Sequence, residues 1–456
     1  MKNMSLNNLI ITRVAPALDR VALIGNNQRI SFQDLLGTCS GLHGKRVAVF
    51  VRNTIDLVRI LVALDGSAKT ICPISTATDT KELRHIIAKH PFDVVITDVG
   101  TRHLQPFSDL DIQIQNLHDV CFLDSFSESQ NNQKSDWLVP TSGTTSMPKL
   151  VSHSISSLGA SSLKMRKLSE QNKIWAQFYD LTRFAGYQVL LNSLLNGHTL
   201  VTLPAEISIH ERVERCAEEF VTHISATPSQ WRKILMTGED AKRIPLEQIV
   251  LGGEAVDQQI LTALSNSYPN AKITHTYAST EAGLGMAVSD RLAGFPLSFI
   301  GNTNGSADIS VRSGKLFLKA PSSASGYVDG KLFKDLEGWI DTGDLVEFVG
   351  DRFIITGRES GIINVGGDKV NPETVRQTLL EHPDVLQAIV FGRKNPITGM
   401  VLSAKIQIKA NVDEMAAMTS IKKFIKESLP MKQRPRLLNF VDDIGVTLTG
   451  KMRSET

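Results

Sequence analysis

Short apolar runs alternate along the chain with stretches in which apolar residues recur every three or four positions. Residues 47–51 (Val-Ala-Val-Phe-Val) and 248–251 (Gln-Ile-Val-Leu) predict buried strands, because the strands of a parallel sheet are covered on both faces. Residues 93–97 predict a further strand, and residues 54–66 predict the helix that follows the strand at 47–51. This alternation is typical of an α/β protein.

The last hundred residues or so carry a separate set of elements. The apolar run 353–356 ends the large region. We therefore expect a large N-terminal domain at 1–357, built from αβ-layered subdomains, and a small α+β C-terminal domain at 358–456. The segments that indicate the small domain are 385–391, 403–409 and 418–428.

Length and composition allow more than one hydrophobic core. The chain has 456 residues, of which 42% are hydrophobic and 21% are charged, so it is too apolar to be disordered. A formal net charge of +2 provides no overall field that would attract nucleic acid or a membrane surface. No run approaches ~20 apolar residues, so we expect no membrane span.

The four cysteines suggest a reducing compartment. Cys39, Cys72, Cys121 and Cys216 lie far apart and form no C-x-x-C pair. This spacing indicates neither a zinc site nor a disulfide framework. We expect buried or inert thiols and a cytoplasmic protein.

A hydroxyl-rich loop in residues 139–153 is the strongest chemical signal in the chain. Its sequence, Val-Pro-Thr-Ser-Gly-Thr-Thr-Ser-Met-Pro-Lys-Leu-Val-Ser-His, can place main-chain N–H groups, hydroxyl groups and one cation around a polyphosphate. The G-x-x-x-x-G-K-[ST] spacing is absent, which argues against a P-loop NTPase. An ordinary Ser/Thr-rich turn is the alternative. The candidate phosphate-binding residues are Thr141, Ser142, Gly143, Thr144, Thr145 and Lys149.

Two segments downstream carry residues that suit a nucleotide. Residues 252–255 (Gly-Gly-Glu-Ala) follow a predicted strand, and glycines at a strand end let a flat ring approach the backbone closely. In residues 276–281 (Thr-Tyr-Ala-Ser-Thr-Glu), Tyr277 offers a stacking face for adenine. In the same segment the Thr280 hydroxyl offers a phosphate contact, and the Glu281 carboxylate an oxygen ligand for Mg²⁺.

A carboxylate follows a Thr-Gly turn in residues 338–345 (Gly-Trp-Ile-Asp-Thr-Gly-Asp-Leu). Asp344, near the end of this segment, can accept hydrogen bonds from both hydroxyl groups of a ribose. Asp341 is expected to form the turn instead. Arg358 comes shortly afterwards, at the end of the run Ile-Ile-Thr-Gly-Arg.

In sequence and in order, these segments resemble the adenylate-forming enzymes, which include acyl- and aryl-CoA synthetases, adenylation domains of non-ribosomal peptide synthesis and luciferases. The family loop runs Thr-Ser-Gly-Thr-Thr-Gly-x-Pro-Lys-Gly, and Ser146 and Leu150 replace two of its glycines here. The resemblance spans residues 141–451 and implies ATP and Mg²⁺. It also implies that the following residues flank the adenine or contact the nucleotide: Gly252, Gly253, Glu254, Ala255, Tyr277, Ala278, Ser279, Asp344 and Arg358.

The resemblance gives the C-terminal domain two roles. The tail Thr-Leu-Thr-Gly-Lys-Met-Arg places Lys451 at the lysine that neutralises charge between the carboxylate and the α-phosphate. Residues 362–373 match a loop that enters the site only after this mobile domain rotates. Gly366 and Gly367 match the glycines that leave room for a pantetheine arm. The catalytic positions implied in this way are Lys451, Glu281 and Thr280.

The implied function is ATP-dependent activation of a carboxylic acid to an acyl- or aryl-adenylate, followed by thioester formation with CoA. Transfer to the phosphopantetheine of a holo carrier protein is one alternative. A catalytically silent ATP-binding sensor is another, suggested by Ser146, Leu150 and by Ser360, which stands where the family usually has a hinge Asp or Lys. C-terminal basic residues form either a solvated face or a docking patch for CoA phosphates or an acidic carrier. They are Lys422, Lys423, Lys426, Lys432, Arg434 and Arg436.

Family substrates enter near residues 177–187, where the sequence leaves several alternatives open. Asp180 either grips the ammonium group of an amino acid, as in amino-acid-activating relatives, or caps the following helix, which is the preferred interpretation. Arg183 either meets a second carboxylate or a phenolate of the substrate, or pairs with Asp180. The aromatic residues are as consistent with core as with pocket lining. The candidate pocket residues are Phe178, Tyr179, Asp180, Thr182, Arg183 and Gly186.

Overall fold

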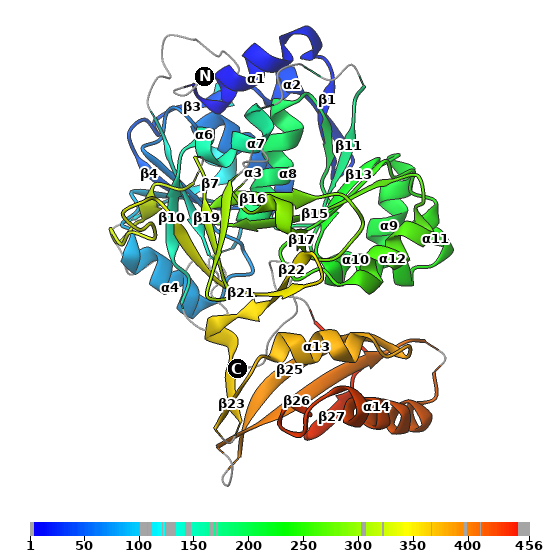
Figure 1. Cartoon of the computed structure of the whole chain (residues 1–456). Coiled ribbons are helices and arrows are strands. Elements are labelled where there is room, and N and C mark those ends of the chain that lie inside the picture. Colours follow the sequence, from blue (N-terminus) through cyan, green and yellow to red (C-terminus); the bar gives the residue numbers. More distant parts are fainter. Residues whose placement is uncertain are drawn as a thin grey trace.

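The computed structural model of the chain separates into a large N-terminal part and a smaller C-terminal part, which follow one another along the sequence (Figure 1). The chain passes from one to the other after residue 358, where a long strand ends and a short 3₁₀ turn begins. The residues that the structure describes are 4–100, 107, 112–120, 122–123, 134–141, 147–164, 168, 171–301, 307–321, 323–365, 367–395, 399–410 and 412–445.

Two large sheets form the centre of the N-terminal part. In the described chain, the first sheet has the strand order β16-β15-β14-β13-β11-β12-β1-β2. Its six inner strands are parallel, and β16 and β2 pair antiparallel at its two edges. The strands are β1 (Val21–Gly25), β2 (Gln28–Ser31), β11 (Ile174–Gln177), β12 (Thr199–Val201), β13 (His223–Ala226), β14 (Gln248–Leu251), β15 (Lys272–Ser279) and β16 (Gly283–Val288).

The second sheet has the order β20-β10-β9-β5-β4-β6-β7 among described residues. The strands from β9 to β7 are parallel, whereas β10 pairs antiparallel with β9 and β20 antiparallel with β10. The strands are β4 (Arg46–Phe50), β5 (Thr70–Pro73), β6 (Val94–Thr97), β7 (Gln113–Asn116), β9 (Asp136–Pro140), β10 (Leu150–His153) and β20 (Gly326–Tyr327). A separate two-stranded pair joins β3 (Thr38–Cys39) to β8 (Phe122–Leu123).

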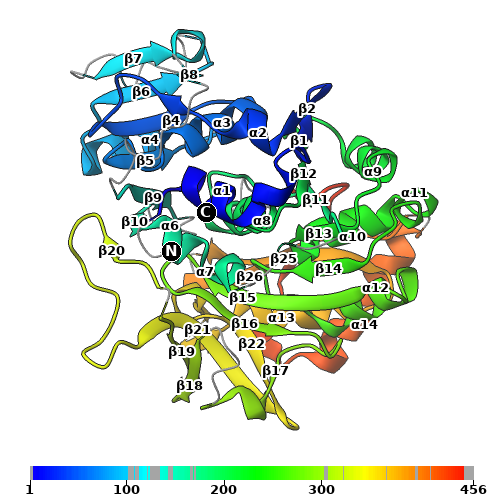
Figure 2. The same cartoon turned by 90° about the horizontal axis from the view of Figure 1, so that it is seen from above.

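Helices between the two sheets complete the main core, as the view from above shows (Figure 2). The core helices are α1 (Leu6–Val14), α3 (Thr54–Leu64) and α8 (Phe184–Leu195). In α3 the apolar face is fully buried, and Asn53 caps the N-terminus by accepting hydrogen bonds from two main-chain N–H groups. The outer helices are α4 (Thr80–Lys89), α9 (Ile209–Glu218), α10 (Pro228–Met236), α11 (Glu239–Lys242) and α12 (Gln258–Ser267). The remaining α-helices of the described N-terminal part are, like α11, single turns: α2 (Phe32–Leu35), α6 (Ile155–Leu158) and α7 (Ala160–Leu163).

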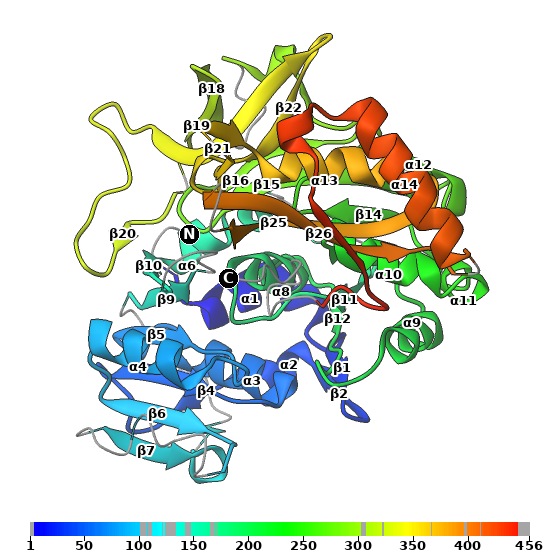
Figure 3. The same cartoon turned by 90° about the horizontal axis from the view of Figure 1, so that it is seen from below.

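A third, antiparallel sheet leads the chain into the C-terminal part. Its order is β17-β22-β21-β19-β18, with its own apolar core. The C-terminal part packs α13 and α14 against three strands and lies on the side of the large part that carries α10 and α12 (Figure 3). The elements are β17 (Phe295–Pro296), β18 (Asp308–Arg312), β19 (Lys315–Lys319), β21 (Ile340–Val349), β22 (Arg352–Arg358), β23 (Ile363–Val365), β24 (Asp368–Val370), α13 (Pro372–Leu380), β25 (Val385–Asn395), β26 (Gly399–Ile408), α14 (Glu414–Ser428) and β27 (Leu437–Phe440).

The α/β class and the division into a large and a small part are confirmed. The predicted strand 248–251 coincides with β14, and the strand predicted at 47–51 is β4, one residue earlier. The helix predicted over 54–66 is α3, which ends two residues sooner. The domain boundary at 357/358 stays a prediction.

Candidate active site

The carboxyl ends of β11, β13, β14 and β15 lie side by side at one edge of the first sheet, where loops of parallel sheets bind ligands. Each strand end carries a segment singled out from the sequence or adjoins one. The turn between β9 and β10, from the second sheet, supplies the candidate phosphate loop. Strand β10, which follows this loop, is joined to the end of β15 by the hydrogen bond between His153 and Thr280 O, so segments far apart in the chain come together here.

The stem of the phosphate loop is closed by two hydrogen bonds between its first and last described residues. Thr141 N donates to Lys149 O at 2.8 Å, and Lys149 N donates to Thr141 Oγ1 at 3.1 Å. The Lys149 side chain is exposed, and its ammonium lies 4.9 Å from the centre of the Tyr327 ring. The candidate residues Ser142, Gly143, Thr144 and Thr145 lie outside the described residues.

The segment 252–255 follows β14 directly. A Cβ on Gly252 would lie 2.8 Å from Thr276 Oγ1, so only glycine fits without a shift of that side chain. Gly253 has a φ of +83°, in the left-handed region that favours glycine. Glu254 contacts the start of α10, where its Oε2 accepts hydrogen bonds from Ser229 N (3.0 Å) and Ser229 Oγ (2.8 Å).

Asp344 is the centre of a polar group at the junction of β15, β21 and β22. The carboxylate is only 7% exposed, and it accepts hydrogen bonds from the Tyr277 hydroxyl and from Arg358 Nε, the latter at 3.0 Å. Burial and the neighbouring Asp344 charge raise the pKa of Tyr277 well above its ordinary value, so the hydroxyl keeps its proton and donates. Burial alone would lower the pKa of Arg358, but Asp344 raises it. The structure thus brings together the three residues expected at the adenine and ribose.

Asp341 occupies the turn before Asp344, as the sequence predicts. Its Oδ1 accepts a hydrogen bond from Gly343 N at 2.8 Å, and Gly343 has a φ of +70°. The Asp344 N–H donates a hydrogen bond to Thr342 Oγ1 at 3.1 Å. The turn therefore presents Asp344 rather than Asp341 to Tyr277.

The end of β15 is fixed by contacts that no local sequence pattern predicts. His153, at the end of β10 and fully buried, donates through Nε2 to Thr280 O at 2.7 Å. Burial lowers the pKa of His153 to about 4, although the bond to Thr280 acts in the opposite direction, so the ring is neutral near pH 7. The Tyr327 hydroxyl donates to Glu281 Oε1 at 2.9 Å. Ser279 Oγ accepts from Ala282 N at 3.0 Å.

The donor chemistry around Glu281 fits Mg²⁺ held together with substrate phosphates. Mg²⁺ is usually bound by one or two carboxylates, phosphate oxygens and waters rather than by an all-protein cage. Among the described residues, Glu281 Oε2 accepts no hydrogen bond, and no group of three or more His, Cys, Asp or Glu side chains could hold a metal. Glu281 therefore suits a metal that arrives with a nucleotide.

Four of the six candidate pocket residues line one cleft of about 690 Å³, namely Phe178, Tyr179, Asp180 and Thr182. The cleft lies at the carboxyl ends of strands from both sheets, including β4, β5, β11 and β12. Arg183 and Gly186 are absent from its lining. Tyr179 Oη donates to Gly252 O at 3.1 Å, which ties this cleft to the segment after β14.

The preferred interpretation of Asp180 as the cap of the following helix is wrong. The N-cap of α8 is Arg183, which supplies no side-chain cap. Asp180 Oδ1 instead accepts hydrogen bonds from Thr182 N and Thr182 Oγ1, both at 2.8 Å, and so forms a turn before the helix. Gly186 packs on this turn so closely that a Cβ would lie 2.1 Å from Asp180 O.

Arg183 does not pair with Asp180 in the part of the chain that the structure describes. Its Nη1 donates to Pro140 O at 3.1 Å, at the root of the phosphate loop. Its Nε is buried, and no described group accepts its hydrogen. The expectation that Arg183 meets a second carboxylate or a phenolate of the substrate stays a prediction.

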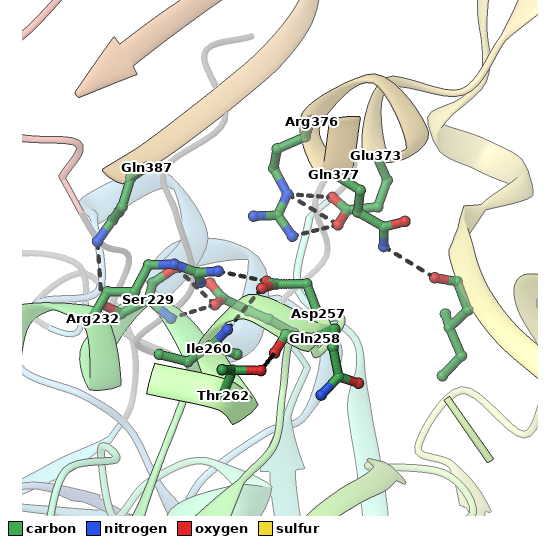
Figure 4. Close-up of polar contacts among 12 residues, drawn as sticks. Ser229, Arg232, Asp257, Gln258, Ile260, Thr262, Glu373, Arg376, Gln377 and Gln387 are labelled. Atoms are coloured by element: carbon green, nitrogen blue, oxygen red, sulfur yellow. Dashed lines mark hydrogen bonds and ion pairs between the residues drawn. The ribbon is translucent and has the colours of Figure 1, made fainter. Parts of the chain in front are cut away.

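The C-terminal part contacts the large part through α13 and β25 (Figure 4). Gln387 Nε2 donates to Ser229 O at 3.2 Å, and Gln377 Nε2 to Ile355 O at 3.3 Å. Arg376 is buried and ion-paired with Glu373, and it also interacts electrostatically with Asp257 and Glu254 of the large part. Asp257 is in turn ion-paired with Arg232 at 2.5 Å.

The loop expected to admit a thiol lies away from the nucleotide segments in this arrangement. Gly367 is exposed, and a Cβ there would meet no atom within 4 Å. Gly366 and Lys451 lie outside the described residues. The entry of this loop into the site after a rotation stays a prediction.

Within the described ranges, no helix has both the length and the apolar character needed to cross a membrane. Cys39, Cys72 and Cys216 are buried and form no disulfide with one another, and burial raises the pKa of the Cys216 thiol to about 12. Cys121 lies outside the described residues.

Comparisons with known proteins point to one family. A family model described as AMP-binding enzyme matches residues 12–327, and a second, described as AMP-binding enzyme C-terminal domain, matches residues 375–451. A probable CoA ligase of Humulus lupulus is 25% identical over 99% of this chain and 95% of its own length. The 2-succinylbenzoate–CoA ligase of Bacillus cereus strain AH820 is 23% identical over 93% of this chain and 92% of its own.

Solved structures share the fold over the whole chain. An anthranilate CoA ligase in complex with anthranoyl-AMP has a TM-score of 0.80 at 17% identity, covering 99% of this chain and 96% of that one. The o-succinylbenzoate CoA synthetase of Bacillus subtilis, in complex with its acyl-adenylate intermediate, has a TM-score of 0.75 at 21% identity, covering 98% and 96%. The fold of the large part and of the small part, and their order along the chain, therefore match those of these two proteins.

Proposed function

The chain belongs to the AMP-binding enzyme family, and from this premise we propose that it activates a carboxylic acid with ATP and then forms a thioester with CoA. The observation that carries the proposal is the meeting of Tyr277, Asp344 and Arg358, with Glu281 near Arg358. Strand β10, which follows the phosphate loop, is joined to the end of β15 by the hydrogen bond from His153 to Thr280 O. Binding of a nucleoside triphosphate needs a ring face for the base, a carboxylate for the ribose and a carboxylate for the metal, and Tyr277, Asp344 and Glu281 offer these groups.

In the first step a carboxylate oxygen of the acid attacks the α-phosphorus of ATP, and pyrophosphate leaves with the electron pair of the broken P–O bond. The residues from Thr141 to Lys149, with Thr280, bind the phosphates. Tyr277 stacks on adenine, and Asp344 and Arg358 hold the ribose. Lys451 stabilises the charge that develops between the acid and the α-phosphate, which is an electrostatic contribution rather than a covalent one. Glu281 would hold Mg²⁺, which would supply further charge neutralisation at the phosphates.

In the second step the C-terminal domain rotates, which withdraws Lys451 and brings the loop with Gly366 and Gly367 to the site. The thiolate of CoA attacks the acyl carbon, and AMP leaves with its phosphate oxygen. Gly367 is exposed, and its one printed hydrogen bond is a local one, from its N–H to Asn364 Oδ1 at 2.9 Å, so the loop is open to solvent in the present arrangement. A domain rotation of this kind lets one site serve two reactions.

The acid is best sought among aryl acids, because similar proteins are named as ligases of 2-succinylbenzoate and of anthranilate. The cleft of about 690 Å³ beside Tyr179 has room for such an acid or for the arm of the thiol. We place the protein in the cytoplasm, where the buried, free cysteines stay reduced.

The test is pyrophosphate release from ATP and Mg²⁺ across aryl, fatty and amino acids. We expect release with one acid class and its loss in Lys451→Ala, whereas Lys423→Ala, an exposed lysine of α14, behaves as the wild type. Binding of ATP without release for any acid would favour the silent sensor. Release followed by transfer to a holo carrier protein, with none to free CoA, would replace CoA as the acceptor.

A further inference from the structure

Tyr327 lies between two segments of the proposed nucleotide site, although it belongs to none of the motifs. It ends the two-residue strand β20, which pairs antiparallel with β10 immediately after the phosphate loop (Val151 with Tyr327, Ser152 with Gly326). The segment leading to β20 is also tied to the end of β15, because Ala324 N donates to Glu281 O at 2.9 Å. The backbone around Tyr327 is therefore fixed to both segments.

The Tyr327 side chain contacts one charged residue of each segment. Its hydroxyl donates to Glu281 Oε1 at 2.9 Å, and the ammonium of Lys149 lies 4.9 Å from the centre of its ring. Phe333 packs edge-on against the same ring, with the ring centres 5.3 Å apart. Burial and the charge of Glu281 raise the pKa of Tyr327, so its hydroxyl stays protonated and donates at every physiological pH.

These contacts constrain two side chains that would otherwise be free to rotate. A hydrogen bond to Oε1 sets the plane of the Glu281 carboxylate and leaves Oε2 available, since no described residue donates to it. An aromatic face attracts a cation electrostatically and limits where a lysine ammonium can lie. The ring and the hydroxyl together hold an anion and a cation at a fixed separation, with the β15 end on one side and the phosphate loop on the other.

We infer that Tyr327 is a positioning residue for the triphosphate and its metal: it orients the Glu281 carboxylate toward Mg²⁺ and holds the Lys149 ammonium at the phosphates. The inference rests on the proposed function, because it takes ATP with Mg²⁺ as the ligand of this site. It adds a residue that acts through Glu281 and Lys149 and that need not touch the nucleotide itself.

The experiment separates the hydroxyl from the ring. Tyr327→Phe removes the hydrogen bond to Glu281 and keeps the ring under Lys149, whereas Tyr327→Leu removes both. ATP binding is measured by calorimetry at a series of Mg²⁺ concentrations, and pyrophosphate release is measured over the same series. Tyr268→Phe is the matched control, because its hydroxyl donates to Ala241 O inside the core of α11 and α12, away from these segments.

We expect Tyr327→Phe to raise the Mg²⁺ concentration for half-maximal ATP binding by about fivefold, the effect of one lost hydrogen bond. The maximal rate at saturating Mg²⁺ and the affinity for ATP without Mg²⁺ should stay as in the wild type. Tyr327→Leu should in addition weaken ATP binding at saturating Mg²⁺ by about threefold or more, through the freed Lys149. Tyr268→Phe should lower the melting temperature and leave the Mg²⁺ dependence unchanged.

An unchanged Mg²⁺ dependence in Tyr327→Phe overturns the inference, whether or not the melting temperature falls. Wild-type ATP binding that needs no Mg²⁺ also overturns it, and leaves nucleotide binding intact. A wild-type protein that binds no ATP refutes the proposed function, and the role of Tyr327 with it.

Discussion

Replacement of Asp257 by asparagine tests the energetics of the contact between the two parts of the protein. Asp257 Oδ2 is ion-paired with Arg232 at 2.5 Å, and the side chains are only 12% and 8% exposed. Asp257 also caps α12, where its Oδ1 accepts from Ile260 N at 3.1 Å. Asparagine is an equally good cap, so Asp257→Asn removes the charge and keeps the helix end.

The expected cost is large because one buried guanidinium group loses its ion-pair partner and a second loses a nearby negative charge. Removing one partner of a buried pair costs about 3–5 kcal/mol, most of it from the charge left behind. Here Arg232 loses its partner, and Arg376 of α13 loses a nearby negative charge (Figure 4). We therefore expect Asp257→Asn to lower the free energy of unfolding by about 3 kcal/mol or more. Arg376 keeps Glu373, which limits the loss.

The assay is urea unfolding followed by tryptophan fluorescence, since the fully buried Trp231 adjoins Arg232 in the chain. The double variant Asp257→Asn with Arg232→Met should recover most of the loss, because no unpaired charge remains. The control is Glu239→Gln in an exposed pair with Lys242, where we expect a change below about 0.5 kcal/mol. A loss of less than about 1 kcal/mol for Asp257→Asn, or no recovery in the double variant, refutes this reasoning.

The pH dependence of the same variant has a definite sign. Burial alone would raise the pKa of Asp257, but Arg232 and Arg376 hold it below its ordinary value of 3.8. The stabilisation by the charge is therefore complete above pH 3.8 and is lost as the pH falls through the lower pKa of the folded state. The difference between the wild type and Asp257→Asn should shrink in that acidic range and be constant at neutral pH.

Two further predictions concern residues that shape the site. Burial lowers the pKa of His153 from 6.5 to about 4, so stability should fall as the pH drops from 6.5 toward 4, by at most about 3 kcal/mol. Melting curves across this range for His153→Gln should show a shallower decline than the wild type; identical curves would contradict the assignment of the proton. Gly186→Ala should destabilise the protein by about 3 kcal/mol or more, because its Cβ would lie 2.1 Å from Asp180 O. Gly361→Ala, with no atom within 4 Å of its Cβ, is the control, and equal melting temperatures for the two variants would rule out the clash.

The sequence predicted elements best where one short segment contains the whole signal. Strand β14 is predicted at its observed bounds because it contains three successive apolar residues, of which Ile249 and Leu251 are buried, and a Gly pair follows it directly. Helix α3 was found because its apolar face repeats helically and a cap residue precedes it. The turn at Asp341 was found for the same reason, since the aspartate and the glycine that it contacts are two residues apart.

The sequence-based prediction fails where the contacts of a side chain depend on segments that are distant in the chain. Asp180 was read as a helix cap, but its carboxylate binds Thr182, and α8 begins only at Phe184. His153 and Tyr327 were missed because their partners, Thr280 and Glu281, are 127 and 46 residues away. No local sequence pattern predicts such contacts, because they depend on which strands pair with one another.

Ser229 and Glu254 connect the candidate site with the contact between the two parts. Ser229, at the start of α10, donates through N and Oγ to Glu254 in the segment after β14, and its carbonyl oxygen accepts from Gln387 of the C-terminal part. Gln387 is buried. Its hydrogen bond to Ser229 joins β25 to α10, so this bond breaks when β25 moves away from α10. A movement of the C-terminal part therefore changes the partners of a residue that also holds the segment 252–255. The arrangement places the domain contact and the proposed nucleotide site in one connected set of hydrogen bonds, so their energies are not independent.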